Sequence, residues 1–307
     1  MISIVIPSHN RPDSLLLALQ SVYKQSCVPD EVIVVDDGSK PAVSDDVFSK
    51  CPVNIKCRLL RNELPQGANK SRNRGVLEAT NEFIAFLDDD DRFTQDKIEK
   101  VMCFIERFPL GDIFYHPARI HMPREKVNYV SKRRPFECGE DVFRSLMIEN
   151  RIGGTSMVIA RRHALVQVGL FDEKLPALQD YELWLRLAMF KKKFVLIDEP
   201  LTGYFHASDV NSISKSVEKK ASARSAIFRK YASAYSTLTK NEVNKLLEKQ
   251  QKSLVSTHIL SQNWVGSVKE QYKLCVGWPS AGNIISLFIV AAGPKFACIA
   301  RAWLGSS

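Results

Sequence analysis

Short apolar runs alternate with amphipathic stretches along the first third of the chain. The runs are rich in Val, Ile, Leu and Phe and are short enough to be buried strands: Ile2 to Ile6, Glu31 to Val35, Cys57 to Leu60 and Phe83 to Leu87. The intervening stretches repeat apolar positions at helical spacing, from Leu15 to Tyr23 and from Ala68 to Ala79. Repeated strand–helix units predict a mostly parallel sheet with helices on both faces.

The pattern is more mixed after Asp112 and becomes almost entirely helical beyond Ser214. Strand-like runs at residues 113–115, 157–160 and 194–197 are interleaved with helices. We therefore expect one α/β domain over residues 1–214, followed by a basic helical appendage over residues 215–307. The last apolar segment is interrupted by Gly293 and Pro294 and falls short of the roughly 20 residues of a spanning helix. It predicts interfacial or packing helices.

The positive charge of the chain concentrates in its C-terminal region. The formal net charge is +9, and from residue 211 to the end 14 Lys and Arg stand against 4 Glu and no Asp. Such a region either attracts an anionic membrane surface or is the solvated face of helices, and the sequence leaves both interpretations open. Nucleic acid is not an expected partner, because few aromatic residues are interleaved with the charges.

The cysteines argue against a disulfide-stabilised protein and against a zinc-binding protein. All seven are scattered and no Cys-x-x-Cys pair occurs, so neither a disulfide framework nor a zinc site is predicted. We expect them to be small buried hydrophobic residues in a reducing compartment. The first apolar run is too short for a signal sequence. We therefore expect a cytoplasmic protein, either free or peripheral at the inner face of the membrane.

Polar clusters follow the predicted strands, and the strongest is a run of four aspartates, Asp88 to Asp91. Ligands of open parallel sheets bind beyond the carboxyl ends of the strands. Like charges ~4 Å apart repel by about 1 kcal/mol in water and more near a protein surface. A divalent cation would relieve the repulsion, with Asp88 and Asp90 in one ligand sphere together with substrate phosphates. The alternative is an acidic turn in which Asp91 caps a helix beginning near Thr94.

Five segments, taken together and in this order, resemble the family 2 glycosyltransferases of the GT-A fold: IVIPSHNRPDSL, EVIVVDDGS, GANKSRNRG, FIAFLDDDD and GLFDEKLPALQDYELWLRL. The resemblance covers roughly residues 1–215. It implies a GT-A, Rossmann-like α/β fold and an inverting enzyme that uses Mn²⁺ or Mg²⁺. The implied reaction moves a sugar from a nucleoside diphosphate, with UDP favoured, to a saccharide or lipid-linked saccharide acceptor in bacterial surface polysaccharide synthesis.

The resemblance also implies roles for individual residues. Those matched to the nucleotide sugar are Pro7 through its backbone, Asp37 toward the base, Arg72, Asp88 and Asp89. Those matched to the metal are Asp88, Asp90 and, as a third ligand, His206. Structural alternatives stay open for three of them: a turn with Gly38 for Asp37, a solvated helix charge for Arg72, and a hydrogen-bonded structural histidine for His206.

A catalytic base is implied at Asp180, ahead of the helix that carries Trp184 and Arg186. Inverting transfer needs such a base to take the proton of the attacking hydroxyl. The family pattern has Glu before this Asp, and here Gln179 removes a charge that could raise the pKa of its neighbour. The alternative role of Asp180 is a helix N-cap. Gly153 and Gly154, ahead of a strand, would let a substrate approach the backbone.

Other classes of protein fit the sequence less well. A sugar nucleotidyltransferase should show a Gly-rich basic loop after the first strand, and SHNRPDS is not one. A metal-dependent phosphohydrolase lacks an evident nucleophile motif. A non-catalytic nucleotide-sugar or carbohydrate binding module remains open, although it has no need of a base such as Asp180. No motif encodes the sugar, the acceptor or the oligomeric state. Both a monomer and an oligomer are compatible with the sequence.

Overall fold

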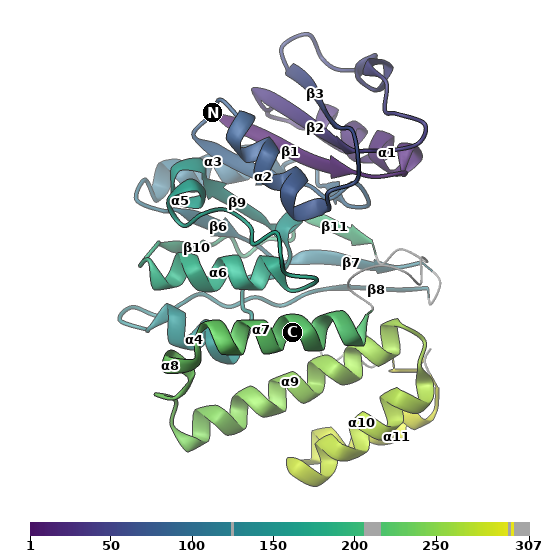
Figure 1. Ribbon diagram of the computed structural model, residues 1–307, viewed down its shortest axis with the longest axis vertical. Coiled ribbons are helices and arrows are strands. Elements are labelled where there is room, and N and C mark those ends of the chain that lie inside the picture. The colour runs from purple at the N-terminus through teal and green to yellow at the C-terminus, as the bar shows by residue number, and fades with distance from the viewer. Residues whose placement is uncertain (124–125, 206–215, 294–295, 298–307) are drawn as a thin grey trace.

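A seven-stranded sheet forms the centre of the computed structural model, which describes residues 1–123, 126–205, 216–293 and 296–297 (Figure 1). The strand order is β10-β6-β9-β4-β1-β2-β3. All neighbours pair parallel except β9, which runs antiparallel to β4 and β6. The strands are β1 (Ile2–Ser8), β2 (Glu31–Asp37), β3 (Lys56–Asn62), β4 (Phe83–Phe86), β6 (Ile113–Tyr115), β9 (Val158–Arg161) and β10 (Phe194–Leu196). The predicted mostly parallel sheet is confirmed.

Helices cover both faces of this sheet, because alternate side chains of each strand point to opposite faces. Ile4 and Ile6 of β1 pack with Leu15 in one core cluster, whereas Val5 packs with Val76 and Leu183 in another. The first face carries α1 (Pro12–Tyr23) and α3 (Lys97–Arg107). The second carries α2 (Ala68–Glu78), α4 (Val142–Ile148), α5 (Arg162–Gln167) and α6 (Gln179–Met189).

A smaller, four-stranded sheet was not predicted from the sequence. Its order is β5 (Arg92–Phe93), β11 (Thr202–Phe205), β7 (Ala118–Met122) and β8 (Val127–Val130). Only β11 and β7 pair parallel. Ile120 and Met122 of β7 form a third core cluster with Val255 and Val290 of the C-terminal helices. This sheet therefore links the main sheet to the C-terminal region.

The C-terminal region is helical, as predicted, and it is fastened to the α/β domain (Figure 1). Its helices are α7 (Val217–Lys230), α8 (Ala232–Tyr235), α9 (Lys240–Leu260), α10 (Trp264–Gly277) and α11 (Ala281–Ala291). Ala223 and Ile227 of α7 are buried in the same cluster as the main sheet. The Tyr231 hydroxyl and the Lys230 ammonium both donate to buried Glu182, at 2.8 and 2.7 Å. The division at residue 214 stays a prediction.

Two further expectations concern the cysteines and the membrane. The six described cysteines are free, and Cys27, Cys103 and Cys138 are exposed. The prediction that the cysteines are buried is therefore wrong for these three, and Cys298 lies outside the described residues. Over the part of the chain that the structure describes, no helix combines the length and the apolarity that crossing a membrane requires.

Candidate active site

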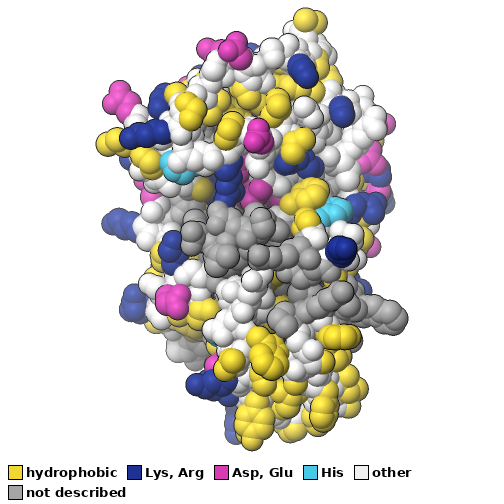
Figure 2. Space-filling model, turned by 90° about the vertical axis from the view of Figure 1, so that its right-hand side faces the viewer, with side chains coloured by type: hydrophobic (Ala, Val, Ile, Leu, Met, Phe, Trp, Pro, Cys, Tyr) yellow, Lys and Arg dark blue, Asp and Glu magenta, His cyan; other side chains and the backbone are white. Residues whose placement is uncertain are grey.

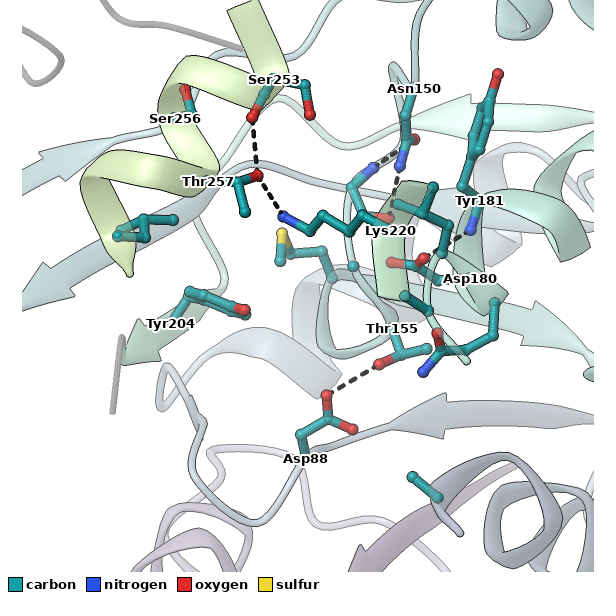
Figure 3. Close-up of a pocket in the computed structure, with 18 of the residues that line it drawn as sticks. Asp88, Asn150, Thr155, Asp180, Tyr181, Tyr204, Lys220, Ser253, Ser256 and Thr257 are labelled. Atoms are coloured by element: carbon teal, nitrogen blue, oxygen red, sulfur yellow. Dashed lines mark hydrogen bonds between the residues drawn. The ribbon is translucent and has the colours of Figure 1, made fainter. Parts of the chain in front are cut away.

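A cavity of about 860 Å³ opens where β1, β2 and β4 end and extends to α7 and α9 (Figure 3). It brings together almost all the residues predicted for the site: Pro7, Asp37, Arg72, Asp88, Asp89, Asp90 and Asp180. Segments far apart in the chain therefore meet beyond the carboxyl ends of the parallel strands, as expected. His206 lies outside the described residues.

Asp37, the last residue of β2, is held by hydrogen bonds at the edge of the cavity. Its carboxylate accepts from Asn62 Nδ2 at 2.8 Å and from the backbone N–H groups of Gln66 and Gly67 at 2.9 and 2.8 Å. Its partners thus come from the last residue of β3 and from the segment after it, and the alternative of a turn with Gly38 is wrong. Burial by itself would raise the pKa of Asp37, but these hydrogen bonds outweigh it and lower the pKa. Asp37 is therefore a firmly ionised acceptor.

Arg72 reaches from α2 into the carboxylate cluster. It is 6% exposed, and its Nη2 lies 2.5 Å from Asp88 Oδ1. The guanidinium also lies over the Phe171 ring, 5.7 Å from its centroid. The alternative of a solvated helix charge is wrong. The second oxygen of Asp88 accepts from Thr155 Oγ1 at 3.1 Å (Figure 3), so Asp88 is oriented from both sides.

Asp89 and Asp90 share one basic partner. Arg11 Nη1 lies 3.3 Å from Asp89 and 3.1 Å from Asp90, and Asp89 also accepts from Ser8 Oγ at 2.8 Å. Burial, followed by the negative charges of Asp88 and Asp89, raises the pKa of Asp90 to about 6. Burial likewise raises the pKa of Asp89. The cluster therefore carries more negative charge than its neighbours compensate.

Asp91 turns away from the other three aspartates and into the core. It is fully buried, and its Oδ1 accepts from the backbone N–H of Phe205 at 3.2 Å. Burial, with the nearby charges of Asp90 and Asp88, raises the pKa of Asp91 well above its usual value. Helix α3 begins at Lys97 with Asp96 at its N-cap position. The alternative in which Asp91 caps a helix is therefore wrong.

A divalent cation fits this cluster only as a site completed by substrate. Among the described residues, no group of three or more His, Cys, Asp and Glu side chains is placed to hold a metal ion. Mg²⁺, however, is commonly held by one or two carboxylates, with water and phosphate oxygens as the remaining ligands. Asp88 and Asp90 both line the cavity. Burial first, and then the charges of Asp88 and Asp89, raise the pKa of Asp90, and a cation would neutralise those charges.

Asp180 lies in the cavity wall at the second position of α6 (Figure 3). The N-cap position is occupied by Leu178, and Asp180 accepts from the N–H of Tyr181 at 2.7 Å, so its role as an N-cap is excluded. Burial raises the pKa of Asp180, and the charge of Arg72 offsets this only in part. A carboxylate whose pKa is shifted toward neutrality is suited to accept a proton.

Gly153 and Gly154 form the strip of backbone beside Asp180. Gly153 has φ +105°, and a Cβ there would lie 2.7 Å from Arg133 Nη2. A Cβ on Gly154 would lie 3.8 Å from Asp180 Oδ2. Trp184 Nε1 donates to the carbonyl of Gly153 at 3.0 Å and fixes the strip. Both glycines line the cavity, as their predicted role requires.

Sequence reasoning missed the wall that α7 and α9 contribute. Basic residues from these helices line the cavity: Lys220, Arg224, Lys249 and Lys252. Arg11, Thr155 and Arg133 were also missed. The concentration of Lys and Arg after residue 211 was the available signal for the first group, but it does not tell which helix face meets the cavity.

Comparison with known proteins supports the geometry. The family profile of glycosyl transferase family 2 matches residues 3–169. An uncharacterized glycosyltransferase of Haemophilus influenzae is 36% identical over 204 residues, 66% of this chain and 67% of that protein. The amylovoran biosynthesis glycosyltransferase AmsB of Erwinia amylovora is 30% identical over 226 residues, 72% of this chain and 74% of that protein.

Solved structures share the fold at low sequence identity. TarS of S. aureus, residues 1–349 with UDP-GlcNAc, has a TM-score of 0.59 at 16% identity, covering 99% of this chain and 92% of that one. The mannosyltransferase PcManGT of Pyrobaculum calidifontis, with GDP-Man and Mn²⁺, has a TM-score of 0.58 at 14% identity, covering 100% and 88%. The GT-A fold expected from the sequence is thereby confirmed. Because the family profile covers more than half of the chain and the relatives are glycosyltransferases, the chain belongs to glycosyl transferase family 2.

Proposed function

We propose that this glycosyltransferase is an inverting enzyme that moves a sugar from a nucleoside diphosphate, with UDP favoured, to a hydroxyl of a saccharide or lipid-linked saccharide. The observation that carries the proposal is that Asp37, the Asp88–Asp90 cluster and Asp180 line one cavity. Surface polysaccharide synthesis is the proposed setting, in line with the Erwinia amylovora relative named for amylovoran biosynthesis. TarS with UDP-GlcNAc favours UDP, and PcManGT with GDP-Man makes GDP the second candidate.

The nucleotide occupies the end of the cavity formed by the main sheet. Asp37 accepts an N–H of the base, because its ionised carboxylate is already directed to the cavity edge. The backbone at Pro7 lines the nucleoside, Arg72 lies beside the phosphates, and Asp89 is directed to the ribose. Asp88 and Asp90 hold Mn²⁺ or Mg²⁺, with His206 as the proposed third ligand. When bound, such a cation offsets the negative charge that develops on the departing diphosphate.

Asp180 is the proposed base. The acceptor oxygen forms a bond to the anomeric carbon while the bond from that carbon to the diphosphate breaks, and the hydroxyl proton passes to the Asp180 carboxylate. The pKa of Asp180, raised mainly by burial, brings the carboxylate closer in basicity to its task. The missing side chains at Gly153 and Gly154 let the Arg133 guanidinium and the Asp180 carboxylate lie close to the backbone of the cavity wall, where the acceptor is proposed to bind.

The first test is release of nucleoside diphosphate from UDP-, GDP- and dTDP-sugars, with Mn²⁺, Mg²⁺ or a chelator. The Asp180→Asn variant should lose about 10²–10⁴-fold in kcat, because an amide cannot take the proton. Asp198→Asn is a matched control, since Asp198 is exposed and outside the cavity. If nucleotide sugars bind but neither water nor any acceptor turns them over, the binding-module alternative gains. Full activity of Asp180→Asn would remove Asp180 from the mechanism.

We also propose that the enzyme works in the cytoplasm at an anionic membrane surface. Apolar side chains gather at the end of the molecule formed by the C-terminal helices (Figure 2). Those more than half exposed are Val265, Tyr272, Val276, Ile285, Phe288 and Phe296. Lys269 and Lys273 lie on the same helix α10 as the first three. An apolar face flanked by lysines is typical of helices that lie at a membrane interface.

Sedimentation with vesicles tests the membrane proposal. Phosphatidylglycerol vesicles at low salt should bind the protein, and phosphatidylcholine vesicles should bind it less, because charge attraction adds to apolar insertion. Phe288→Ser should weaken the binding, whereas Val53→Ser, which removes an exposed apolar side chain at the opposite end of the sequence, should not. Equal binding of both vesicle types, or of neither, would contradict the proposal.

A further inference from the structure

The two ends of the cavity carry opposite charge. The end formed by the main sheet holds Asp37 and the Asp88–Asp90 cluster, with Arg11 and Arg72 as its basic residues. The other end, which we call the basic wall, is lined by five basic residues: Arg133, Lys220, Arg224, Lys249 and Lys252. The α7 and α9 residues in the lining include no acidic side chain, and Glu149 is the acidic residue nearest to them in the lining. The acceptor has to occupy this end if the nucleotide occupies the other.

Hydrogen bonds and ion pairs account for part of the basic wall. Lys249 pairs with Glu149 at 2.6 Å, and Lys252 pairs with Glu248 of its own helix at 2.7 Å. The Lys220 ammonium donates to Thr257 Oγ1 at 3.0 Å, so it joins α7 to α9 across the cavity (Figure 3). These lysines have clear structural partners.

Arg224 is different, because none of the described residues pairs its charge with a carboxylate. Among the described residues it makes no hydrogen bond or ion pair, and it lies close to Tyr181 and Tyr235. Arg224 is partly exposed and lines the cavity, and its partial burial lowers the pKa of the guanidinium. An anionic ligand in the cavity would supply the counter-charge that this partly buried cation lacks among the described residues.

Arg133 is the second basic residue that makes no ion pair with a carboxylate among the described residues, although the charge of Glu149 acts on it from a greater distance. It donates to the carbonyls of Ile152 and Lys132 at 3.1 and 2.9 Å, and to the sulfur of Met157 at 3.8 Å. Burial lowers its pKa as well. Its guanidinium lies against Gly153, whereas Asp180 lies against the adjacent Gly154. One arginine of the wall is thus next to the proposed base.

We propose that the acceptor carries a phosphate near its attacking hydroxyl, and that Arg133 and Arg224 bind this phosphate. The proposal rests on the proposed function, because it assigns the end of the cavity beyond Asp180 to the acceptor. Phosphate fits better than a single carboxylate, since two guanidinium groups can match its two negative charges and its several acceptor oxygens. Phosphate attached to a soluble or polymeric saccharide and the diphosphate of a lipid-linked saccharide share this chemistry.

The experiment is calorimetric titration of the full chain, saturated with UDP and Mn²⁺ so that the nucleotide end is filled. The probes are N-acetylglucosamine 1-phosphate, neutral N-acetylglucosamine, and N-acetylglucosamine linked to farnesyl diphosphate. Both phosphorylated probes should bind at least tenfold more tightly than the neutral sugar, because charge-assisted hydrogen bonds are the strong ones. Tighter binding of the farnesyl probe would identify a lipid diphosphate as the source, and equal binding of the two a saccharide phosphate.

Variants assign the effect to the basic wall. Arg224→Gln should weaken both phosphorylated probes roughly tenfold and leave the affinity for UDP unchanged. Lys219→Gln, which removes an exposed charge of the same helix outside the cavity, is the matched control. Circular dichroism of each variant monitors folding, and Arg224→Lys should recover part of the affinity.

Three results would overturn the inference: equal binding of neutral and phosphorylated sugars, no binding of either phosphorylated probe, or no effect of Arg224→Gln. Failure of the proposed function gives a different result, namely no binding of UDP in the presence of Mn²⁺. In that case titration of the phosphorylated probes into the protein without nucleotide still tests Arg224, because the matched variants are compared under the same condition.

Discussion

Two aspartate clusters follow buried strands of the same sheet, yet their electrostatics are opposite. Asp36 and Asp37 end β2, and Asp88 to Asp91 follow β4. Both oxygens of Asp36 accept backbone N–H groups, from Ser39 at 3.0 Å and Val43 at 3.1 Å, and Arg61 pairs with it. Hydrogen bonds lower the pKa of Asp37. After β4, burial and mutual repulsion raise the pKa of Asp89, Asp90 and Asp91.

The difference shows that position in the fold does not determine how a carboxylate can be used. The β2 cluster is compensated by donors that belong to the protein. The β4 cluster has fewer donors for each carboxylate, because Arg11 is shared by Asp89 and Asp90 while Arg72 serves Asp88. Its remaining charge is available to a cation brought with the substrate. The β2 cluster is therefore suited to recognise the nucleotide. The β4 cluster is suited to a reaction in which negative charge develops on the departing diphosphate.

The largest expected effect comes from removing the charge of Asp90. Asp90→Asn should lower metal-dependent turnover by at least about 100-fold, or about 2.7 kcal/mol of transition-state free energy, because even the partners of metal ligands matter by 10–100-fold. Thermal stability without metal should stay equal or rise, since like-charge repulsion is relieved. Donor-sugar turnover across a Mn²⁺ titration, together with a melting curve, measures both. Loss of stability in parallel with activity would make Asp90 structural and remove the contrast with Asp37.

The next effect is on folding, at Asp37. Asp37→Asn should lower the free energy of unfolding by about 1–3 kcal/mol, because the new amide places N–H groups against the donors from Asn62, Gln66 and Gly67. Urea unfolding of this variant beside Asp198→Asn measures the difference. An unchanged free energy of unfolding would mean that the donors around Asp37 do not compensate its charge.

The smallest effect near neutral pH concerns Asp180. Burial raises the pKa of Asp180, just as burial raises the pKa values in the β4 cluster. The base acts only when ionised, so kcat should fall as the pH drops through this raised pKa. The decline should begin above the usual range of an aspartate and reach about tenfold per pH unit below it. A kcat profile with Mg²⁺ and with Mn²⁺ locates the acid limb. A kcat that stays constant down to ordinary aspartate pKa values would show that the pKa of Asp180 is not raised. Asp180 would then resemble Asp37, not the β4 cluster.

The sequence by itself determined the local order of the main sheet and the composition of its ligand-binding edge. Continuous apolar runs and helical spacing are properties of neighbouring residues, so the strands β1 to β4 and the helices between them were predictable. The aspartate clusters were predictable for the same reason, because they directly follow those strands and parallel strands end at one edge. The family motifs placed Asp180 in the same site, although the sequence separates it widely from Asp37.

Only the tertiary structure decided what surrounds these residues. β9 runs antiparallel, and the strands of the second sheet are short. Apart from the β7–β8 hairpin they pair across long stretches of chain, which local patterns do not reveal. Arg224 became a cavity residue because α7 packs beside α6 and not because of its neighbours in sequence. The direction of each pKa shift also depends on spatial partners: Asp37 and Asp90 are the same residue type after similar strands, and burial, donors and nearby charges separate them.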